Sequence, residues 1–394
     1  MTAKARERAV LVSLDFGRAE SRESLEELRL LVEGAGAMVL AAVEGSRREP
    51  DPALFLGQGK VTEVAGAVAA HEATLVVVNH DISAVQQRNL ERELKVPVVD
   101  RTGLILDIFA QRARSAEGKL QVELAQLERL STRLIRGWTH LERQKGGIGL
   151  RGPGETQLET DRRLIGHRVK LLKQRLDKVR SQRRTQRRAR ARSGTLNVSL
   201  VGYTNAGKST LFNRLTNAGA YAADQLFATL DTTARRLHVG GGRQVVVSDT
   251  VGFIRHLPTS LVEAFRATLE ETIDADLLLH VVDASHPDRD QQIEAVEQVL
   301  SEIGAGAVPQ WRVMNKVDLL GQPARVERDD CDRLAAVWVS AVNGEGVALL
   351  RDALAEFAAG PAHAVLNDSA KPAIQSALPT EPTHVAERSA VGAS

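Results

Sequence analysis

One segment of the chain combines two glycines, a lysine and a hydroxyl at the spacing of a phosphate-binding loop. It reads Gly202-Tyr203-Thr204-Asn205-Ala206-Gly207-Lys208-Ser209, which matches the pattern G-x-x-x-x-G-K-S. Glycines let such a loop wrap closely around a polyphosphate, while backbone N–H groups and the start of a following helix supply partial positive charge. We expect Lys208 to reach the β- and γ-phosphates and the Ser209 hydroxyl to ligate Mg²⁺.

A second motif, D-x-x-G, follows the apolar run 245–248 and reads Asp249-Thr250-Val251-Gly252. We expect Asp249 to hold Mg²⁺ through a water molecule and Gly252 to present its N–H to the γ-phosphate. Alone this motif is weak, because a surface turn can have the same sequence. Its place after a strand and downstream of the phosphate-binding loop favours the nucleotide interpretation.

Two further segments predict which base is bound. Asn315-Lys316-Val317-Asp318 has the pattern N-K-x-D, and Ser340-Ala341-Val342 follows the next apolar run. The Asp318 carboxylate can accept hydrogen bonds from both guanine N1–H and the 2-amino group, and adenine offers no such donor pair. Asn315 can reach the Hoogsteen edge, the Lys316 stem can lie over the ring, and a backbone N–H at 340–342 suits guanine O6. GTP and GDP are therefore the expected ligands.

A switch threonine that completes the Mg²⁺ shell must lie between Lys208 and Asp249. The segment Phe227-Ala228-Thr229-Leu230-Asp231-Thr232-Thr233 contains three candidates, Thr229, Thr232 and Thr233. The spacing of the residues does not decide among the three.

The elements that must position these motifs are short apolar strands at 196–201, 245–248, 312–314 and 335–339, with a helix at 210–216. Each motif comes where a strand ends, which is where ligands bind in parallel α/β sheets. Two histidines near these motifs invite catalytic roles. We expect His280 to be a core histidine inside the apolar run 277–282, and nothing pairs His256 with a role.

The 394 residues predict more than one domain. Strands at 9–15, 37–43, 75–78 and 96–99 alternate with helices at 24–33, 58–70 and 83–94, which indicates a small parallel α/β domain. The predicted fold class is α/β, with an N-terminal α/β domain at 1–106, a helical hairpin at 107–194, a P-loop domain with a doubly wound, mostly parallel sheet at 195–360, and a disordered tail at 361–394.

Two apolar seams with a spacing of three and four residues predict the hairpin. They consist of Leu120, Leu124, Leu127, Leu134, Trp138 and Leu141, and of Ile165, Val169, Leu172, Leu176 and Val179. Two ordinary core helices would show a similar pattern. Residues 145–154 contain five glycines and a proline, so we expect a backbone-exposed loop at the tip of the hairpin, suited to a phosphate backbone.

Positive charge is concentrated in the second helix of this hairpin. Residues 162–192 contain fourteen Lys and Arg and one acid, Asp177, a net charge of +13 in a chain whose total is +2. Charge runs are often solvated helix faces, but thirteen uncompensated charges repel each other unless a polyanion is bound. With almost no aromatic residue in the run, we expect contacts to RNA phosphates and recognition of shape, without base stacking.

Cys331 is the single cysteine, so a disulfide within the chain is excluded. The apolar runs are of strand length, and no long apolar core follows Lys4, Arg6 and Arg8, so we expect neither a membrane span nor a signal peptide. The expected location is the cytoplasm.

Taken together, these motifs resemble the HflX family of ribosome-associated GTPases, within the Obg–HflX group. The resemblance covers about residues 8–357 and rests on segments 146–163, 202–209, 227–231, 249–254 and 275–285. We expect Lys208, Thr229 and Gly252 to be the catalytic groups. The resemblance implies that Thr229 is the switch threonine. It also implies binding to the large ribosomal subunit and its rRNA through the basic helix and the glycine-rich loop, and the splitting or rescue of ribosomes.

Phe253 follows Gly252, where many GTPases have a glutamine that orients the attacking water. A phenyl ring cannot do this, so intrinsic hydrolysis should be slow, and we hypothesise that the ribosome orders the switch loops. Asn205 resembles an asparagine of GTPases that hold a K⁺ ion beside the phosphates.

An alternative to a ribosome-splitting GTPase is a nucleotide-dependent RNA-binding or ribosome-assembly module in which GTP is an occupancy signal. A signalling GTPase would leave the basic helix without a role. The protein is expected to be a monomer off the ribosome.

Overall fold

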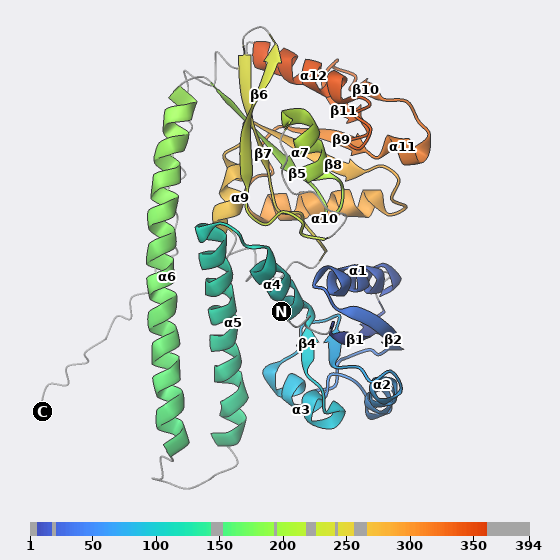
Figure 1. Ribbon diagram of the computed structural model, residues 1–394, viewed down its shortest axis with the longest axis vertical. Coiled ribbons are helices and arrows are strands. Elements are labelled where there is room, and N and C mark those ends of the chain that lie inside the picture. The colour runs from blue at the N-terminus through green and yellow to red at the C-terminus, as the bar shows by residue number, and fades with distance from the viewer. Residues whose placement is uncertain are drawn as a thin grey trace, which may run out of the picture.

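The computed structural model describes residues 6–17, 21–142, 153–192, 195–217, 226–240, 243–255 and 266–360. These residues form an N-terminal α/β part, a pair of long helices and a second, larger α/β part (Figure 1). The predicted fold class is confirmed. The tail predicted at 361–394 and the candidate His256 lie outside the described residues.

The N-terminal part is built on a parallel sheet with the strand order β2-β1-β3-β4. Its strands are β1 (Arg8–Asp15), β2 (Met38–Ser46), β3 (Leu75–Val78) and β4 (Val98–Asp100). β1 lies inside the sheet and is apolar on both faces, with Ala9 and Leu11 in one hydrophobic cluster and Val10 and Val12 in another. Such two-sided burial explains why the predicted strand is a continuous apolar run.

Helices cover both faces of this sheet (Figure 1). α1 (Ser21–Gly34) and α4 (Arg101–Arg112) pack on the face of Leu11, and α2 (Gln58–Ala70) and α3 (Ala84–Leu94) on the face of Val10. The predicted boundary at residue 106 falls within α4. The helix continues through this position, and Ile105 and Ile108 on either side of it are both buried in the core.

The helical hairpin consists of α5 (Ala116–Glu142) and α6 (Pro153–Arg192), which lie side by side (Figure 1). Within the predicted seams, Leu124, Leu172 and Leu176 are buried, and Leu120, Leu127 and Val169 pack against them. The side chains of Leu134, Trp138 and Leu141 lie outside the described part of the chain.

The predicted glycine-rich loop at 145–154 is too long at its C-terminal end. Residues 145–152 lie outside the described part of the chain. Pro153 and Gly154, predicted as loop, instead open α6. Proline is favoured at the first position of a helix, because its missing N–H has no partner there in any case.

The second α/β part has a seven-stranded sheet with the order β10-β11-β9-β8-β5-β7-β6. Its strands are β5 (Leu196–Val201), β6 (Thr233–Gly240), β7 (Arg243–Asp249), β8 (Leu277–Asp283), β9 (Gln310–Asn315), β10 (Arg325–Arg328) and β11 (Leu334–Trp338). β6 pairs antiparallel with β7, and β10 with β11, while the other neighbours are parallel. The sheet is therefore mostly parallel, as predicted.

Helices also cover both faces of the second sheet. α7 (Lys208–Thr216) and α12 (Val347–Ala359) share one hydrophobic cluster with β5, and α9 (Arg266–Ile273) and α10 (Arg289–Glu302) pack on the opposite face. α11 (Val317–Leu320) is a single turn after β9. His280 lies within β8 and is 1% exposed, which confirms it as a core histidine. Within the described residues, no helix is both long and apolar enough to cross a membrane.

Candidate functional site

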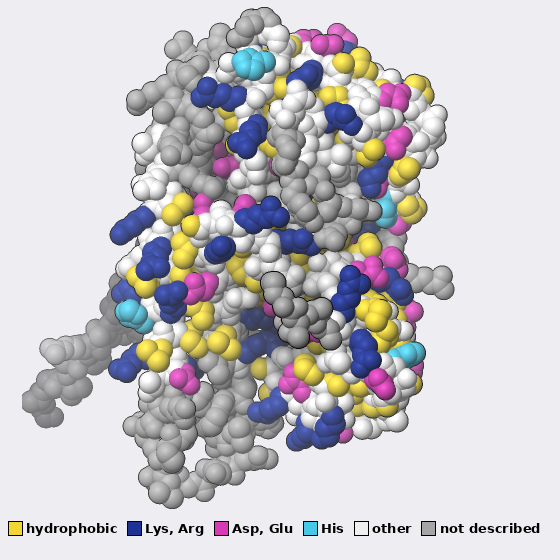
Figure 2. All heavy atoms as spheres, viewed as in Figure 1, with side chains coloured by type: hydrophobic (Ala, Val, Ile, Leu, Met, Phe, Trp, Pro, Cys, Tyr) yellow, Lys and Arg dark blue, Asp and Glu magenta, His cyan; other side chains and the backbone are white. Residues whose placement is uncertain are grey.

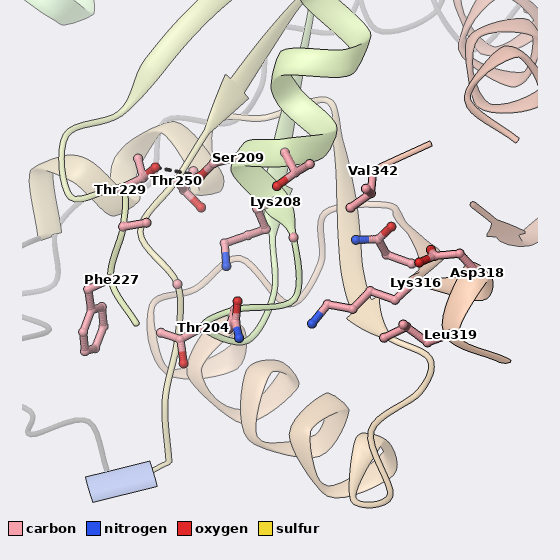
Figure 3. Close-up of a pocket in the computed structure, with 16 residues that line it drawn as sticks. Thr204, Lys208, Ser209, Phe227, Thr229, Thr250, Lys316, Asp318, Leu319 and Val342 are labelled. Atoms are coloured by element: carbon pink, nitrogen blue, oxygen red, sulfur yellow. Dashed lines mark hydrogen bonds between the residues drawn. The ribbon is translucent and has the colours of Figure 1, made fainter. Parts of the chain in front are cut away.

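A cavity of about 380 Å³ opens where β5, β7 and β9 end. All four sequence motifs and the segment 227–229 contribute to its wall (Figure 3). The lining residues are Thr204, Asn205, Gly207, Lys208, Ser209, Thr210, Phe227, Ala228, Thr229, Thr250, Gly252, Asn315, Lys316, Asp318, Leu319 and Val342. Thr210 and Leu319 were not predicted, although each directly follows a predicted residue. A cavity of this size and polarity suits a nucleotide.

The loop between β5 and α7 has the backbone that its glycines predict. Gly202 and Gly207 have φ of +146° and +93°, and a Cβ atom on either would lie 2.2 Å from Val281 O or Asn315 Nδ2. Asn205 also has a positive φ, 63°. Glycine is required at positions 202 and 207, because a side chain there would strain the backbone and clash with a neighbouring atom.

Lys208 lies buried beneath this loop. Its Nζ donates to Gly202 O at 3.1 Å and to Tyr203 O at 2.7 Å. Burial lowers the pKa of Lys208 to about 8, and the nearby Asp249 carboxylate opposes that shift. In Figure 3 the ammonium group points into the cavity, so an anion there would stabilise the charged form. Gly252 also lies beside Lys208, since a Cβ atom added to Gly252 would be 2.9 Å from Lys208 Nζ.

Three oxygen-bearing side chains converge at one end of the cavity. Ser209 Oγ donates to Asp249 Oδ2 at 2.7 Å and lies 2.7 Å from Thr229 Oγ1, which donates to the same Oδ2 at 3.0 Å. Thr233, in contrast, opens β6 opposite Asp249 in the ladder. The fold therefore brings Thr229, among the three candidate threonines, to the other two predicted metal ligands.

This oxygen cluster fits a magnesium ion. Burial raises the pKa of Asp249, although the hydrogen bond from Ser209 and the charge of Lys208 act in the opposite direction. Within the described residues, Asp249 Oδ1 is buried without a hydrogen-bond partner. A hard divalent cation prefers such hydroxyl and carboxylate oxygens and would offset the cost of the buried charge.

The opposite end of the cavity holds the predicted base-recognition residues (Figure 3). Asn315 is 2% exposed; its Nδ2 donates to Ala206 O at 2.8 Å and its Oδ1 accepts from Ala341 N at 2.9 Å. Its amide thus joins the phosphate-binding loop to the loop 340–342, and one Nδ2 hydrogen remains for a ligand. Lys316 Nζ pairs with Asp283 Oδ2 at 2.7 Å, and the Asp318 side chain is exposed at the rim.

Some predicted ligand contacts do not line the cavity. The side chains of Tyr203, Leu230 and Val251 belong to a hydrophobic cluster that also contains Phe109 of α4 and Val122 of α5. Other predicted residues outside the wall are Gly202, Ala206, Asp231, Asp249, Val317, Ser340 and Ala341. The phosphate-binding loop and the switch segment thus face two ways, toward the cavity and toward the N-terminal part.

Phe253 belongs to the same cluster and is 1% exposed. Its backbone pairs with the phosphate-binding loop: Phe253 N donates to Gly202 O at 3.1 Å, and Thr204 N donates to Phe253 O at 2.7 Å. The ring is therefore buried away from the cavity, at the position where a glutamine could otherwise contact water.

A polar contact between the two α/β parts has no recognisable signal in the sequence. The Tyr203 hydroxyl donates to Glu27 of α1 and accepts from Arg255 N at 3.0 Å, and Arg101 of α4 forms an ion pair with the same Glu27. Burial, together with the charge of Glu27, raises the pKa of Tyr203 well above its ordinary value. No motif marks Glu27 or Arg101, because nothing local indicates that a helix residue will meet a loop 176 residues away.

The described basic side chains of α6 are mostly exposed, and Figure 2 shows them gathered along this helix, at the left of the view. Three of them make ion pairs: Arg168 with Glu123, Lys173 with Glu128, and Arg180 with Glu270 of α9. Within the described residues, five others make no ion pair, and we call these the basic face: Arg162, Arg163, Lys170, Arg175 and Lys178.

Comparison with known proteins gives a consistent result over residues 22–316. Three family descriptions match in succession: "GTP-binding GTPase N-terminal" at residues 22–110, "GTP-binding GTPase Middle Region" at 112–190 and "50S ribosome-binding GTPase" at 197–316. The chain is 56% identical over 357 residues to GTPase HflX of Escherichia coli (strain K12), covering 90% of this chain and 84% of that protein.

A second relative has the same name. GTPase HflX of Caldanaerobacter subterraneus subsp. tengcongensis is 48% identical over 353 residues, covering 89% of this chain and 81% of its own. A GTP-binding protein from Sulfolobus solfataricus, solved in complex with GDP, aligns with 89% of this chain and 98% of its own, at 24% identity and a TM-score of 0.47.

Proposed function

The chain belongs to the HflX family of GTPases, and from that premise we propose that it binds the large ribosomal subunit and couples GTP binding and hydrolysis to ribosome dissociation or rescue. The basic face of α6 is the observation that carries the ribosomal part of this proposal. Five exposed cations on one helix, with no acidic partner in the described part of the chain, suit the phosphates of folded RNA. The proposed location is the cytoplasm, on ribosomes.

In the proposed nucleotide site, Ser209 and Thr229 would hold Mg²⁺ directly and Asp249 would hold it through water. The bound ion would neutralise charge on the β- and γ-phosphates. Lys208 would bind the same phosphates, and its proximity to Gly252 supports contact of both residues with the same γ-phosphate. A K⁺ ion beside Asn205 is a further candidate charge. Replacing KCl by NaCl is then expected to slow turnover, and equal rates would exclude K⁺.

At the other end of the site, we propose that Asp318 selects guanine and that Lys316 lies over the base. The ion pair between Lys316 and Asp283 supports this, because it holds the lysine stem along the cavity wall. Calorimetry tests the assignment. Asp318→Ala is expected to abolish the preference for GDP over ADP, and an unchanged preference would contradict it.

Hydrolysis in the free protein should be slow, because the buried Phe253 offers no group to orient water. We propose that the ribosome orders the missing element. Multiple-turnover GTP hydrolysis with and without large subunits tests this idea. Equal rates would favour the alternative, in which GTP is an occupancy signal for an RNA-binding module.

Cosedimentation with ribosomes in the presence of GTP, GDP or a non-hydrolysable analogue tests the whole proposal. The analogue is expected to give the most binding. The triple variant Lys170→Glu, Arg175→Glu and Lys178→Glu should lose binding. The slope of the logarithm of the binding constant against the logarithm of salt concentration should become shallower by about one unit for each contact removed.

A matched control reverses three exposed arginines elsewhere, Arg48→Glu, Arg92→Glu and Arg236→Glu, with the same change in net charge. If both triple variants lose binding to the same extent, overall charge and not the basic face explains the association.

A further inference from the structure

Asp231 connects the switch segment to the start of the hairpin. Its Oδ2 accepts hydrogen bonds from Arg114 N at 2.8 Å and Ser115 N at 2.7 Å, and its Oδ1 accepts from Ser115 Oγ at 2.6 Å. The carboxylate thus takes three donors from a turn that lies 116 residues earlier in the chain.

This turn is the N-terminus of α5. Ser115 precedes the helix, and its Oγ accepts from Gly118 N at 2.8 Å, the arrangement of a helix cap. A carboxylate here also meets the positive end of the helix dipole. Asp231 therefore stabilises the N-terminal cap of α5, although Asp231 itself belongs to the second α/β part.

α4 and the start of α5 hold the switch segment at two points, with Thr229 between them. Phe227 packs edge-on against Phe109 of α4, with the ring centroids 4.8 Å apart, and Asp231 binds the start of α5. Leu230 is 3% exposed in the hydrophobic cluster shared with α4 and α5. Thr229 can keep its contact with Asp249 only while this short segment stays in place.

We infer that Asp231 is a positioning residue for GTP hydrolysis: by binding the start of α5 it holds Thr229 against Ser209 and Asp249. The inference rests on the proposed role of Thr229 as a metal ligand. The coupling is reciprocal, as linkage requires. A nucleotide that draws Thr229 into the metal site stabilises the start of α5, and loss of that contact loosens it.

Gly118 offers a way to displace Asp231 without changing the switch segment. A Cβ at residue 118 would lie 2.1 Å from Asp231 Oδ1 and 3.2 Å from Ser115 Oγ. Gly118→Ala therefore expels the carboxylate, while alanine itself favours the helix. Gly59→Ala is the matched control, since Gly59 is in the first turn of α2 and a Cβ there meets nothing within 4 Å.

The experiment measures GTP turnover and GDP affinity of the full-length protein without ribosomes. Asp231→Ala and Gly118→Ala are each expected to lower kcat by about 5- to 30-fold, the range expected when hydrogen bonds to a charged group no longer hold Thr229 in place. GDP affinity should change less than about twofold, because the phosphate and base contacts are intact. Gly59→Ala should leave both unchanged. A merely structural defect would lower GDP affinity together with kcat.

A double-mutant cycle separates displacement of Asp231 from other effects of the alanine. In the Asp231→Ala background, Gly118→Ala should lower kcat no further, because the displaced group is gone. Additive losses would overturn the inference. Should Asp231→Ala not yield folded protein, Gly118→Ala and Ser115→Ala carry the test.

Thr229→Ala distinguishes failure of this inference from failure of the proposed site. If Thr229→Ala lowers kcat while Asp231→Ala and Gly118→Ala leave it unchanged, the positioning role is wrong and the metal site stands. If Thr229→Ala has no effect on kcat, the proposed role of Thr229 is wrong, and the inference fails with it.

Discussion

Replacing Asn315 by alanine is expected to weaken both the fold of the nucleotide site and the binding of GDP. The Asn315 amide joins two loops that are far apart in sequence, through Ala206 O at 2.8 Å and Ala341 N at 2.9 Å. Because the side chain is 2% exposed, water does not replace these contacts readily. Asn315→Ala leaves one carbonyl and one N–H buried without a partner.

Each such group costs about 1–3 kcal/mol, so the free energy of unfolding should fall by about 2–6 kcal/mol. If the two loops separate in the free protein, even the lower figure would raise the Kd for GDP by about 30-fold. The loss should be similar for GTP, because the damage lies in the placement of the loops and not at the γ-phosphate.

Urea unfolding of the nucleotide-free variant gives the first quantity, and calorimetry with GDP gives the second. Measuring stability without nucleotide isolates the bridge between the loops from any contact to the base. Asn343→Ala is the control, because Asn343 is exposed in the same region and bonds locally to Glu345 N. A loss below about 0.5 kcal/mol for Asn315→Ala, the range of an ordinary surface change, would refute the reasoning.

Binding of GDP near pH 8 is expected to take up protons, because burial lowers the pKa of Lys208 to about 8 and bound phosphate favours its charged form. Calorimetry in buffers of different ionisation heat measures this, and no uptake would contradict it. Burial likewise lowers the pKa of His280 from 6.5 to about 3. As the pH falls from 6.5 toward 3, the His280 side chain is protonated in the unfolded chain but not in the folded protein, so acidification destabilises the fold. His280→Leu should reduce that loss by about 1.4 kcal/mol per pH unit in urea titrations, and an equal slope in both proteins would count against it. Tyr203→Phe should cost about 1–3 kcal/mol in thermal unfolding, because it removes the buried hydrogen bonds that the hydroxyl makes with Arg255 N and Glu27; an unchanged melting curve would show that this contact is unimportant.

The sequence was sufficient for the fold class and for the ends of the strands where the motifs lie. Parallel buried strands are continuous apolar runs, and the phosphate-binding loop needs glycine where φ is positive, as at Gly207. Both signals are local, so they can be read without knowing which segments meet. The same holds for the basic run of α6, whose charge depends on composition alone.

Tertiary structure decided which side of each motif faces the cavity. Spacing left three threonines open, and the fold brought Thr229 beside Ser209 and Asp249. It turned Asp231 toward α5 and joined Tyr203 to Glu27, across 116 and 176 residues of chain. The physical reason is that these contacts depend on how the two α/β parts and the helical hairpin pack together. A motif specifies the backbone of its own few residues, and the partners of its outward-facing side chains come from elsewhere in the chain.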